Sequence, residues 1–303
     1  LYIEGKGTPI DYNKSSEWLL KGTKNGGLIA NKAKAEYSLG WMFLTGNGVD
    51  KDYKEALRWL TSAANKGYAK AHNHLGSMHD KGYGVKKDKV KAFEFYLYAA
   101  NKGMVESQER VGERYRTGEG VNKDYYQAAR WYKKAAKGGD RTSQNNLGTM
   151  YFEGKGVEKD YVEAVKWFKK SANAGNDAGQ YSLGTIYSHG LGVSQNYDTA
   201  VYWFKKSADQ NNSYAQQDLG IIYVTHKKDY YTAAKWFEKA ANQGMAKSQY
   251  MLALLYDNGS PLQENPDKVK YWAKKAMENN DQSVAKDAEK LLKKHQKWYE
   301  KLF

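Results

Sequence analysis

The chain repeats one arrangement of small, apolar and polar positions every 36 residues. In each period one segment carries an apolar residue followed by glycine, and a second segment carries an aromatic residue at a fixed distance behind it. The apolar–glycine pairs are Leu39-Gly40, Leu75-Gly76, Val111-Gly112, Leu147-Gly148, Leu183-Gly184 and Leu219-Gly220, with Leu252-Ala253 at the seventh position. Self-similarity at a period of about 20 to 50 residues is the signature of a repeat architecture.

Each period predicts two helices, because apolar residues recur within both segments at helical spacing. A Gly-x-Gly-Val sequence ends the first helix in five periods, beginning at Gly46, Gly82, Gly118, Gly154 and Gly190. Asp52 and Glu55 have the spacing of a capping box at the start of a second helix. Second helices end at Gly67, Gly103, Gly139, Gly175 and Gly244, and at Asn211 and Asn280 in two periods. Gly and Asn both accept the left-handed conformation of a helix C-cap.

The period is broken in two places. The aromatic markers are Trp59, Phe95, Trp131, Trp167 and Trp203 at steps of 36 residues, then Trp236 after 33 and Trp272 after 36. The missing residues remove the Gly-x-Gly-Val loop of the sixth full period. At the other end, residues 1–26 match the second half of a period. We therefore expect that the first helix of this copy is missing and that Leu1 is not the native start.

The last segment, residues 281–303, has a different pattern. An amphipathic stripe runs through Val284, Ala288, Leu291, Leu292, His295, Trp298 and Leu302. Because a solenoid needs a terminal element with a polar outer face, we predict a capping helix, with a docking helix for a partner as the alternative. The predicted organisation is a repeat domain at 1–280, comprising a partial repeat at 1–26 and seven full repeats, and an amphipathic capping helix at 281–303.

The whole pattern is clearest in residues 142–175. They read Gln-x-x-Leu-Gly-x-x-Tyr-x-x-Gly-x-Gly-Val followed by Asp-Tyr-x-x-Ala-x-x-Trp, which resembles the Sel-one-like repeats, a branch of the tetratricopeptide repeat superfamily. The resemblance implies an all-α fold, an α-solenoid in which helix-turn-helix repeats build a right-handed superhelix with a concave groove. It also implies a bacterial source and a role in protein–protein interaction. Several members of the family carry a cysteine pair in each repeat, and this chain has none.

The amino-acid composition excludes several kinds of functional site. The absence of cysteine excludes disulfides, thiolate metal sites and a cysteine nucleophile. The longest apolar run, Tyr250 to Tyr256, is far shorter than the roughly 20 residues that span a bilayer. The sequence leaves the compartment open, and only the family resemblance favours the bacterial periplasm or secretion.

No catalytic or metal-binding constellation emerges. The Gly-x-Gly loops follow a helix and lack the third glycine of a dinucleotide fingerprint. His72 and His74 stand two apart and point to nearly opposite faces of a helix, and His79 occupies a slot that holds tyrosine in other repeats. We therefore predict a protein that is not an enzyme and has no cofactor, no metal and no small-molecule substrate.

The net charge is 48 − 34 = +14, and its most regular source is a lysine pair behind the aromatic marker. The pairs are Lys133-Lys134, Lys169-Lys170, Lys205-Lys206 and Lys274-Lys275. They are predicted to lie on an outer, solvated face without interleaved exposed aromatic side chains. Nucleic acid and membrane are therefore disfavoured as partners, although an adaptor to nucleic acid or anionic lipid stays an alternative.

Positions that differ between repeats are the candidate binding positions, because recurring residues maintain the fold. In tetratricopeptide-type solenoids the first helix lines the groove, so the candidates lie on one stripe of the first helices. The predicted groove residues are Tyr37, Trp41, Leu44, Asn73, Ser77, Glu106, Glu109, Glu113, Arg116, Asn145, Phe152, Tyr181 and Tyr250. The middle of the stripe is acidic, which suggests a partner segment that carries Lys or Arg. Trp41 is either a binding anchor or a residue that packs against residues 28–34.

These observations favour a non-enzymatic interaction scaffold, or adaptor, that binds a polypeptide through its concave groove. An immunity protein that neutralises a secretion-system toxin, such as a phospholipase effector, is the narrower alternative suggested by the family.

Overall fold

The computed structural model describes residues 29–257, 262–279 and 281–299 of the chain. The partial repeat at 1–26, the C-cap at Asn280 and Leu302 lie outside the described residues, as do the side chains of His295 and Trp298. Across the described ranges the chain forms fifteen α-helices and one π-helical turn, and no strand. The all-α prediction is confirmed.

The chain divides into two compact units, residues 1–159 and 160–303. The helices of unit 1 are α2 Ile29–Thr45, α3 Tyr53–Asn65, α4 Ala69–Lys81, α5 Lys89–Asn101, α6 Val105–Thr117, α7 Tyr125–Lys137 and α8 Arg141–Glu153. Those of unit 2 are α9 Tyr161–Asn173, α10 Asp177–His189, α11 Tyr197–Asp209, α12 Ser213–Ile222, the π-helical turn Tyr223–Lys227, α13 Tyr230–Asn242, α14 Ala246–Tyr256, α15 Pro266–Met277 and α16 Gln282–Tyr299.

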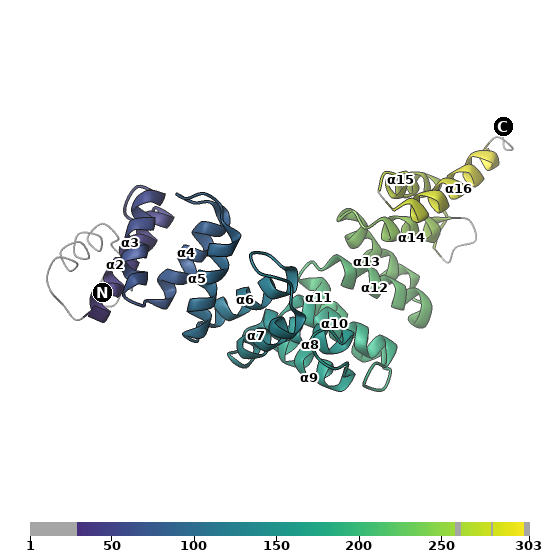
Figure 1. The fold of residues 1–303 in the computed structure, drawn as a ribbon. Helices are drawn as coiled ribbons and strands as arrows, with labels where there is room; N and C mark the ends of the chain where they lie inside the picture. The colour runs from purple at the N-terminus through teal and green to yellow at the C-terminus, as the bar shows by residue number, and fades with distance from the viewer. Residues whose placement is uncertain (1–28, 258–261, 280, 300–303) are drawn as a thin grey trace, which may run out of the picture. The chain divides into compact units, whose positions relative to one another are not determined.

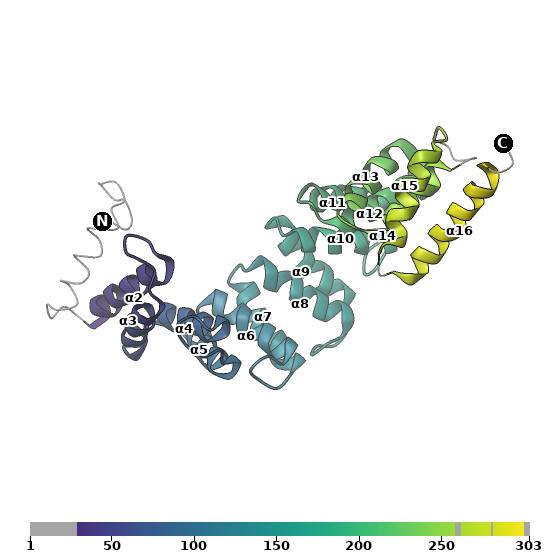
Figure 2. The same cartoon turned by 90° about the horizontal axis from the view of Figure 1, so that it is seen from above.

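Within each unit every helix packs against the next one along the chain (Figures 1 and 2). Even-numbered helices from α2 to α14 are the first helices of the repeats, and odd-numbered helices from α3 to α15 are the second helices. Short connections join them, as in other stacked helix pairs. The helix-pair repeat predicted from the 36-residue period is confirmed.

An acidic or amide side chain caps the start of every second helix. The capping residues are Asp52, Asp88, Asp124, Asp160, Asn196, Asp229 and Asn265, and each side chain accepts a hydrogen bond from a backbone N–H of the first turn. The predicted capping box is only half formed. Glu55 accepts hydrogen bonds from Arg58 and Trp59, while the N–H of Asp52 donates to the carbonyl of Phe43 at 3.0 Å.

A glycine in the middle of α2, α4, α6, α10 and α12 lets the second helix of the same repeat approach closely. A Cβ atom at Gly184 would lie 2.4 Å from the ring of Phe204, and one at Gly76 would lie 2.7 Å from the ring of Tyr96. Gly112, Gly220 and Gly40 face Tyr132, Phe237 and Leu60 at similar distances. Since real Cβ contacts do not approach this closely, the bulky residue of the second helix occupies the space that the glycine leaves.

Buried glutamines connect consecutive repeats. The side-chain Nε2 of each donates to a carbonyl in the last turns of the preceding second helix, eight residues back. The pairs are Gln108–Ala100, Gln144–Ala136, Gln180–Ala172, Gln216–Ala208 and Gln249–Ala241, at 3.0 to 3.3 Å. Each of these carbonyls also accepts a hydrogen bond from the backbone N–H three residues on, so the glutamine supplies a second bond to an oxygen with two lone pairs.

The loop that follows α4, α6, α8 or α10 packs against the preceding repeat. In the regular repeats its second glycine lies on the start of the preceding second helix, where a Cβ at Gly156 would lie 2.1 Å from the carbonyl oxygen of Tyr125. The shortened sixth repeat has the π-helical turn instead. There the ring of His226 stacks on Tyr197 with centroids 3.6 Å apart, and Lys227 pairs with Asp198. A side-chain contact therefore replaces the glycine contact, and Asn211 adopts φ = 69°, as predicted for a C-cap.

The last helix, α16, packs against α14 and α15. Ala288 and Leu291 are buried in one cluster with Leu252, Trp272 and Ala276, and Lys294 pairs with Asp257 of the segment after α14 at 2.8 Å. The described part of the apolar stripe thus packs against the last repeat. That it also docks a partner stays a prediction.

The close approach of the helices generates the first testable prediction. Gly184→Ala should lower the free energy of unfolding by about 1–3 kcal/mol, the usual cost of overpacking a core. At an unconstrained helix position the same change gains about 1 kcal/mol, so the sign of the effect is diagnostic. Urea denaturation followed by circular dichroism measures it. In a Phe204→Ala background the ring is gone and the cost of Gly184→Ala should vanish; a cost that persists there would contradict the steric explanation.

A second prediction concerns the sixth repeat. His226→Ala removes the stack on Tyr197, and aromatic stacking contributes about 0.5–1.5 kcal/mol. Amide exchange in residues 223–230 should therefore become about 3- to 10-fold faster, while residues 141–153 of α8 serve as the internal control. Unchanged protection at the π-helical turn would show that the stack does not hold this segment.

Candidate functional site

The predicted groove residues are carried by first helices of both units. The predicted residues from Tyr37 through Phe152 in the list above lie on α2, α4, α6 and α8 of unit 1. The remaining two, Tyr181 and Tyr250, lie on α10 and α14 of unit 2. We call the surface of α2, α4 and α6 around Tyr37, Trp41, Glu106, Glu109 and Glu113 the first-helix face of unit 1. Except for Asn73, the predicted residues are half-buried or exposed.

Tyr37 belongs to a cluster of rings between α2 and α4. Its hydroxyl lies 3.2 Å from Nε2 of His74, and its ring lies 5.0 Å from that of Tyr68. Burial, with the nearby Tyr68 and Glu106, raises the pKa of Tyr37 to about 12. Burial also lowers the pKa of His74, although Glu106 opposes this. The face therefore presents a neutral, aromatic surface here.

Trp41 and Leu44 lie next to this cluster on α2. Both are half-buried, and Leu44 packs against the core cluster that contains Ala56, Leu60 and Leu75. The exposed part of the Trp41 indole extends the apolar end of the face. Residues 28–31, the other predicted neighbours of Trp41, carry no described side chains.

Asn73 is not a surface residue. Only 4% of it is exposed, and its Oδ1 accepts a hydrogen bond from the hydroxyl of Ser107 at 2.9 Å. It joins α4 to α6 and is removed from the candidate site, whereas Ser77 on the same helix is half-buried.

The acidic patch predicted on α6 is largely neutralised. Glu106 pairs with Arg110 at 2.9 Å. Glu113 accepts hydrogen bonds from Arg116 at 2.5 and 2.8 Å and from the hydroxyl of Tyr132 at 2.6 Å. Because the arginines stand one turn away from the glutamates, most of the negative charge is compensated within α6.

Glu109 is the exception. No donor among the described residues forms a hydrogen bond or ion pair with its carboxylate, which is half-buried. Burial and the carboxylates of Asp140, Glu113 and Glu106 raise the pKa of Glu109, and only Arg110 opposes them. Glu109 also borders a small cavity of about 200 Å³ lined by Arg110, Glu113, Arg114, Thr117 and Glu119.

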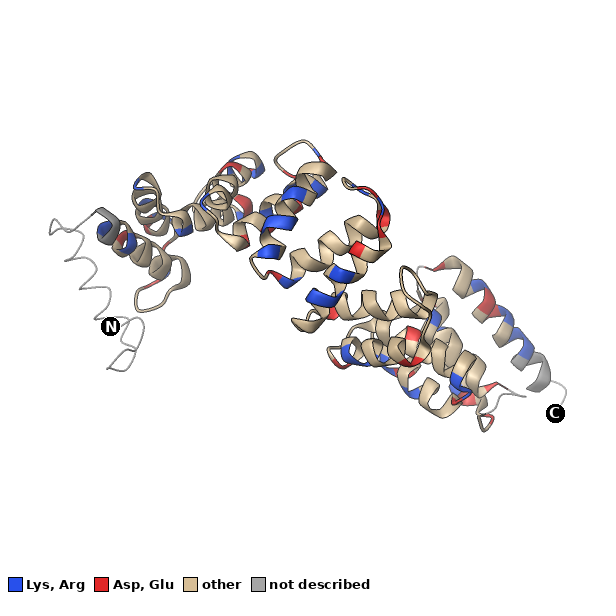
Figure 3. Cartoon of the chain, turned by 90° about the horizontal axis from the view of Figure 1, so that it is seen from below, with Lys and Arg blue, Asp and Glu red and all other residues tan. Residues whose placement is uncertain are grey.

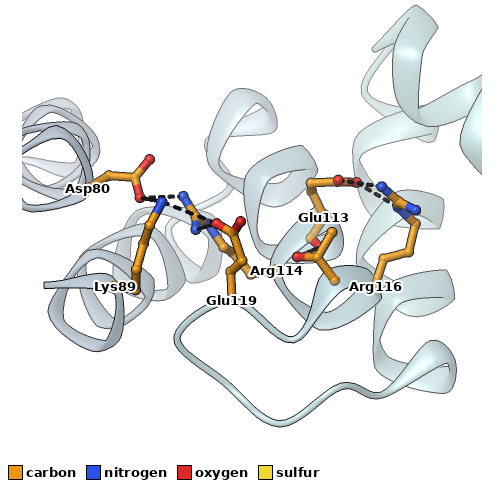
Figure 4. A network of polar contacts seen from close by, with 7 residues as sticks. Asp80, Lys89, Glu113, Arg114, Arg116 and Glu119 are labelled. Atoms are coloured by element: carbon orange, nitrogen blue, oxygen red, sulfur yellow. Dashed lines mark hydrogen bonds and ion pairs between the residues drawn. The ribbon is translucent and has the colours of Figure 1, made fainter. Parts of the chain in front are cut away.

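A charge network that the sequence analysis missed lies beside this cavity (Figure 4). Asp80 of α4 pairs with Lys89 of α5 at 2.6 Å and with Arg114 of α6 at 2.7 Å, and both cations also pair with Glu119 of the loop after α6. Burial alone would raise the pKa of Asp80, but hydrogen bonds from Lys89 and Arg114 outweigh it and the pKa is lowered.

The sequence does contain a feature that distinguishes Arg114 from the equivalent residues of the other repeats. It stands two residues after the mid-helix glycine, where the other repeats carry Met42, Met78, Met150, Ile186, Ile222 and Leu255. These residues are all buried, and Arg114 is only 8% exposed. A single charged residue at an otherwise apolar core position points to a buried ion pair.

The predicted residues of the later first helices show a related arrangement. The hydroxyl of Tyr181 donates to Asp218 of α12 at 3.1 Å, in the same relative positions as Tyr37 and His74. Burial and Asp218 raise the pKa of Tyr181 to about 12. Tyr250 on α14, and Asn145 and Phe152 on α8, are half-buried, and nothing brings Tyr181 and Tyr250 into contact.

The outward lysines have a structural role. Lys134, Lys170 and Lys239 place their ammonium groups 3.8 to 4.3 Å from the ring centroids of Trp131, Trp167 and Trp236. Such cation–π contacts explain why lysine recurs three residues after the aromatic marker. The expectation that no exposed aromatic side chains interleave with them was wrong, because Tyr126, Tyr202, Tyr231 and Tyr271 are more than half exposed on second helices.

The described residues contain neither a metal-binding cluster nor a membrane-spanning helix. No group of three or more His, Cys, Asp or Glu side chains is placed to hold a metal ion. No helix within the described ranges is long and apolar enough to cross a membrane. The histidines contact aromatic rings instead, as His72 does with Tyr98 at 3.7 Å and His79 with Phe95 at 5.3 Å.

Comparison with known proteins identifies the same repeat. The family model of the Sel1 repeat matches residues 1–27, 33–68, 69–104, 105–140, 142–176, 177–212, 213–245 and 246–281. A protective antigen of uropathogenic Escherichia coli with this fold is 36% identical, with a TM-score of 0.84 over 93% of this chain and 60% of that chain. The present chain thus spans about 60% of the length of that antigen.

A Sel1 repeat protein from Oxalobacter formigenes is 27% identical, with a TM-score of 0.72 over 92% of this chain and 86% of that chain. An immunity protein from Pseudomonas aeruginosa is 19% identical, with a TM-score of 0.44 over 73% of this chain and 83% of that chain, which is too distant a likeness to bear on function. No curated protein matches the chain.

Glu109 and Glu113 of α6 give opposite predictions for stability. The folded chain holds the proton of Glu109 more tightly than the unfolded chain does, because its pKa is raised. Its charge therefore opposes folding at neutral pH, and this penalty disappears as the pH falls below the raised pKa. Glu109→Gln should raise the melting temperature at pH 7, by the few tenths of a kcal/mol typical of like-charge relief on a helix, and should have no effect at pH 4.

Glu113→Gln is the matched control. Burial raises the pKa of Glu113, but hydrogen bonds from Arg116 and Tyr132 outweigh it and the pKa is lowered. Its ionised form therefore stabilises the fold at neutral pH, and this stabilisation is lost as the pH falls through the lowered pKa. Glu113→Gln should lower the melting temperature at pH 7. Equal shifts for the two variants would contradict the assignment of Glu109 as the uncompensated carboxylate.

Proposed function

The chain belongs to the Sel1 repeat family, and from that premise we propose that it is a non-enzymatic scaffold that binds a polypeptide partner through the first-helix face of unit 1. Proteins of this family generally serve protein–protein interaction rather than catalysis. The described residues fit that role, because the polar groups on this face are arranged around contacts between repeats and form no constellation of nucleophile and base.

One observation carries the proposal. Glu109 keeps a half-buried carboxylate to which no described residue donates, beside Asp140 and at the edge of a cavity. A charge in such surroundings destabilises the isolated protein, and natural proteins often retain such groups where function needs them. A Lys or Arg side chain of a partner would supply the missing donor, as the acidic stripe of the sequence suggested.

The surface next to Glu109 indicates which other side chains the partner segment should carry. Trp41 and the rings of Tyr37 and Tyr68 present a half-buried aromatic area on α2 and α4. Interface hot spots are enriched in Trp, Tyr and Arg and lie in partly enclosed apolar surroundings. The partner that fits is a segment with an apolar residue for the aromatic area and a cationic residue for Glu109.

An immunity function is a narrower form of the same binding role. The immunity protein from Pseudomonas aeruginosa is too distant to support it for this chain, and no residue described above is specific to it. Rescue of a host cell from a co-expressed toxin by this chain would be the observation that favours it. Binding of nucleic acid or anionic lipid by lysines concerns a different surface, the outer faces of the second helices.

The proposal is tested by selecting a displayed random peptide library on the intact chain. Selected peptides should contain an apolar residue and a Lys or Arg. Trp41→Ala should weaken their binding about 30-fold or more, corresponding to the roughly 2 kcal/mol or more of a buried anchor. Glu109→Lys should slow association and reduce its salt dependence. Isothermal calorimetry and stopped-flow fluorescence measure both effects.

Lys169→Ser/Lys170→Ser provides the control, because both lysines are exposed on α9, outside the proposed face. This double variant should bind the selected peptides like the parent chain. If it abolishes binding while Trp41→Ala and Glu109→Lys have no effect at retained helicity, the first-helix face is not the binding surface.

A further inference from the structure

The second helices of unit 2 present the same exposed stripe toward solvent. Their exposed residues recur at the second, sixth, ninth and tenth helical positions, which share one face of an α-helix. The residues are Val162, Lys166, Lys169 and Lys170 on α9, Asp198, Tyr202, Lys205 and Lys206 on α11, Tyr231, Lys235, Glu238 and Lys239 on α13, and Asp267, Tyr271, Lys274 and Lys275 on α15. We call this surface the lysine–tyrosine face, and Figure 3 marks its charges.

Most lysines of this face lack a carboxylate partner. Lys166 pairs with Glu163 and Lys275 pairs with Glu278. No ion pair within the described residues joins a carboxylate to the remaining lysines, Lys169, Lys170, Lys205, Lys206, Lys235, Lys239 and Lys274. The stripe also carries three acidic residues. Asp198 is already paired with Lys227, which leaves Glu238 and Asp267 beside these lysines. The face is therefore strongly positive.

Tyrosine rings stand among these lysines. The sixth helical position alternates between lysine and tyrosine along α9, α11, α13 and α15, as Lys166, Tyr202, Lys235 and Tyr271. Tyr202 is 51% exposed, Tyr231 is 74% exposed and Tyr271 is 54% exposed. Each of α11, α13 and α15 thus offers one exposed aromatic ring beside lysines without a carboxylate partner, and on α11 the Lys206 ammonium already lies 4.8 Å from the ring centroid of Tyr202.

The face is hollowed between α11 and α13. A depression of about 500 Å³ is lined by Lys205 of α11 and by Thr232, Lys235, Trp236, Glu238, Lys239 and Asn242 of α13. Trp236 is half-buried, and the Lys239 ammonium lies 4.0 Å from its ring centroid. Three lysines and one carboxylate therefore surround a partly apolar floor, and Tyr202 and Tyr231 belong to the same two helices.

We propose that the lysine–tyrosine face of unit 2 binds single-stranded nucleic acid, with phosphates paired to the lysines and bases stacked on the tyrosine rings. Proteins that bind single strands without sequence preference combine a positive groove with aromatic rings in this way. An anionic bilayer fits less well, because membrane-surface helices insert Trp, Phe and Leu from an apolar face. The large hydrophobic side chains exposed on α11 and α13 are tyrosines. An acidic peptide would engage the lysines and leave the tyrosine faces without a role.

The experiment is fluorescence anisotropy with a labelled 15-nucleotide oligothymidylate and with an oligouridylate of the same length, using the intact chain. An abasic oligomer of equal length and charge separates stacking from charge. We expect both labelled strands to bind, and the abasic strand to bind at least fivefold more weakly. Three to five lysine contacts predict a slope of about −2 to −3.5 for log affinity against log salt concentration.

Three variants make the test specific. Lys235→Gln/Lys239→Gln should weaken binding about tenfold and reduce the salt slope by about 1.4, because each phosphate contact contributes about 0.7 for single strands. Tyr231→Ser should weaken binding of the oligothymidylate about fivefold and leave the abasic strand unaffected. Lys290→Gln/Lys293→Gln makes the same charge change on α16 of the same unit and should have no effect. Circular dichroism verifies that each variant is folded.

Three outcomes would overturn the proposal. One is the absence of binding at 50 mM salt, and another is equal affinity for the abasic and base-containing strands. The third is binding to phosphatidylserine vesicles, lost in Lys235→Gln/Lys239→Gln, by a chain that does not bind the oligonucleotides. That result would assign the face to anionic lipid.

Discussion

The close approach of the two helices within each repeat is the constraint on which the rest of the structure depends. A first-helix glycine faces a bulky residue of the second helix, and no Cβ atom fits between them. The seventh repeat shows the same complementarity in another form, because Ala253 replaces the glycine and Ala273 takes the place of the bulky residue, and both are fully buried. Because the two helices of a repeat lie this close together, the buried glutamines can bond to the end of the preceding second helix. The loops can likewise contact the preceding repeat.

Much of the fold could be predicted from the sequence, because each repeat is a further instance of the same pattern of helices, caps and loops. The period located the helices, and the exchange of Gly for Asn211 at a C-cap identified a left-handed position. The contact that replaces the missing loop of the sixth repeat could not be predicted. Stacking of His226 on Tyr197 depends on the path of a π-helical turn, and no periodic signal specifies that path.

For the candidate site, the sequence could predict the stripe of first-helix positions but not how their side chains pair. Tyr37, Glu109 and Glu113 are half-buried, and that they bind a partner stays a prediction. Which carboxylate keeps its charge uncompensated depends on side chains from other positions, such as Arg116 and Tyr132 around Glu113. Asn73 differs because its hydrogen-bond partner comes from the next repeat. Side-chain contacts between neighbouring repeats depend on side-chain geometry. They cannot be predicted from the spacing of residues along one helix.

Arg114 has a consequence for how such a chain can evolve. Stacked repeats resemble interchangeable units, since each contacts only its neighbours, and a unit can be duplicated or deleted while the apolar core positions still match. Arg114 breaks that interchangeability, because its partner Asp80 and the bridging Lys89 both belong to the preceding repeat. Deleting residues 69–104 would place Arg114 next to Leu44, which stands at the position of Asp80. The buried cation would then keep only Glu119 of its own repeat, a carboxylate that is 53% exposed, and losing one partner of a buried ion pair is costly. One charged residue thus requires the second full repeat to precede the third.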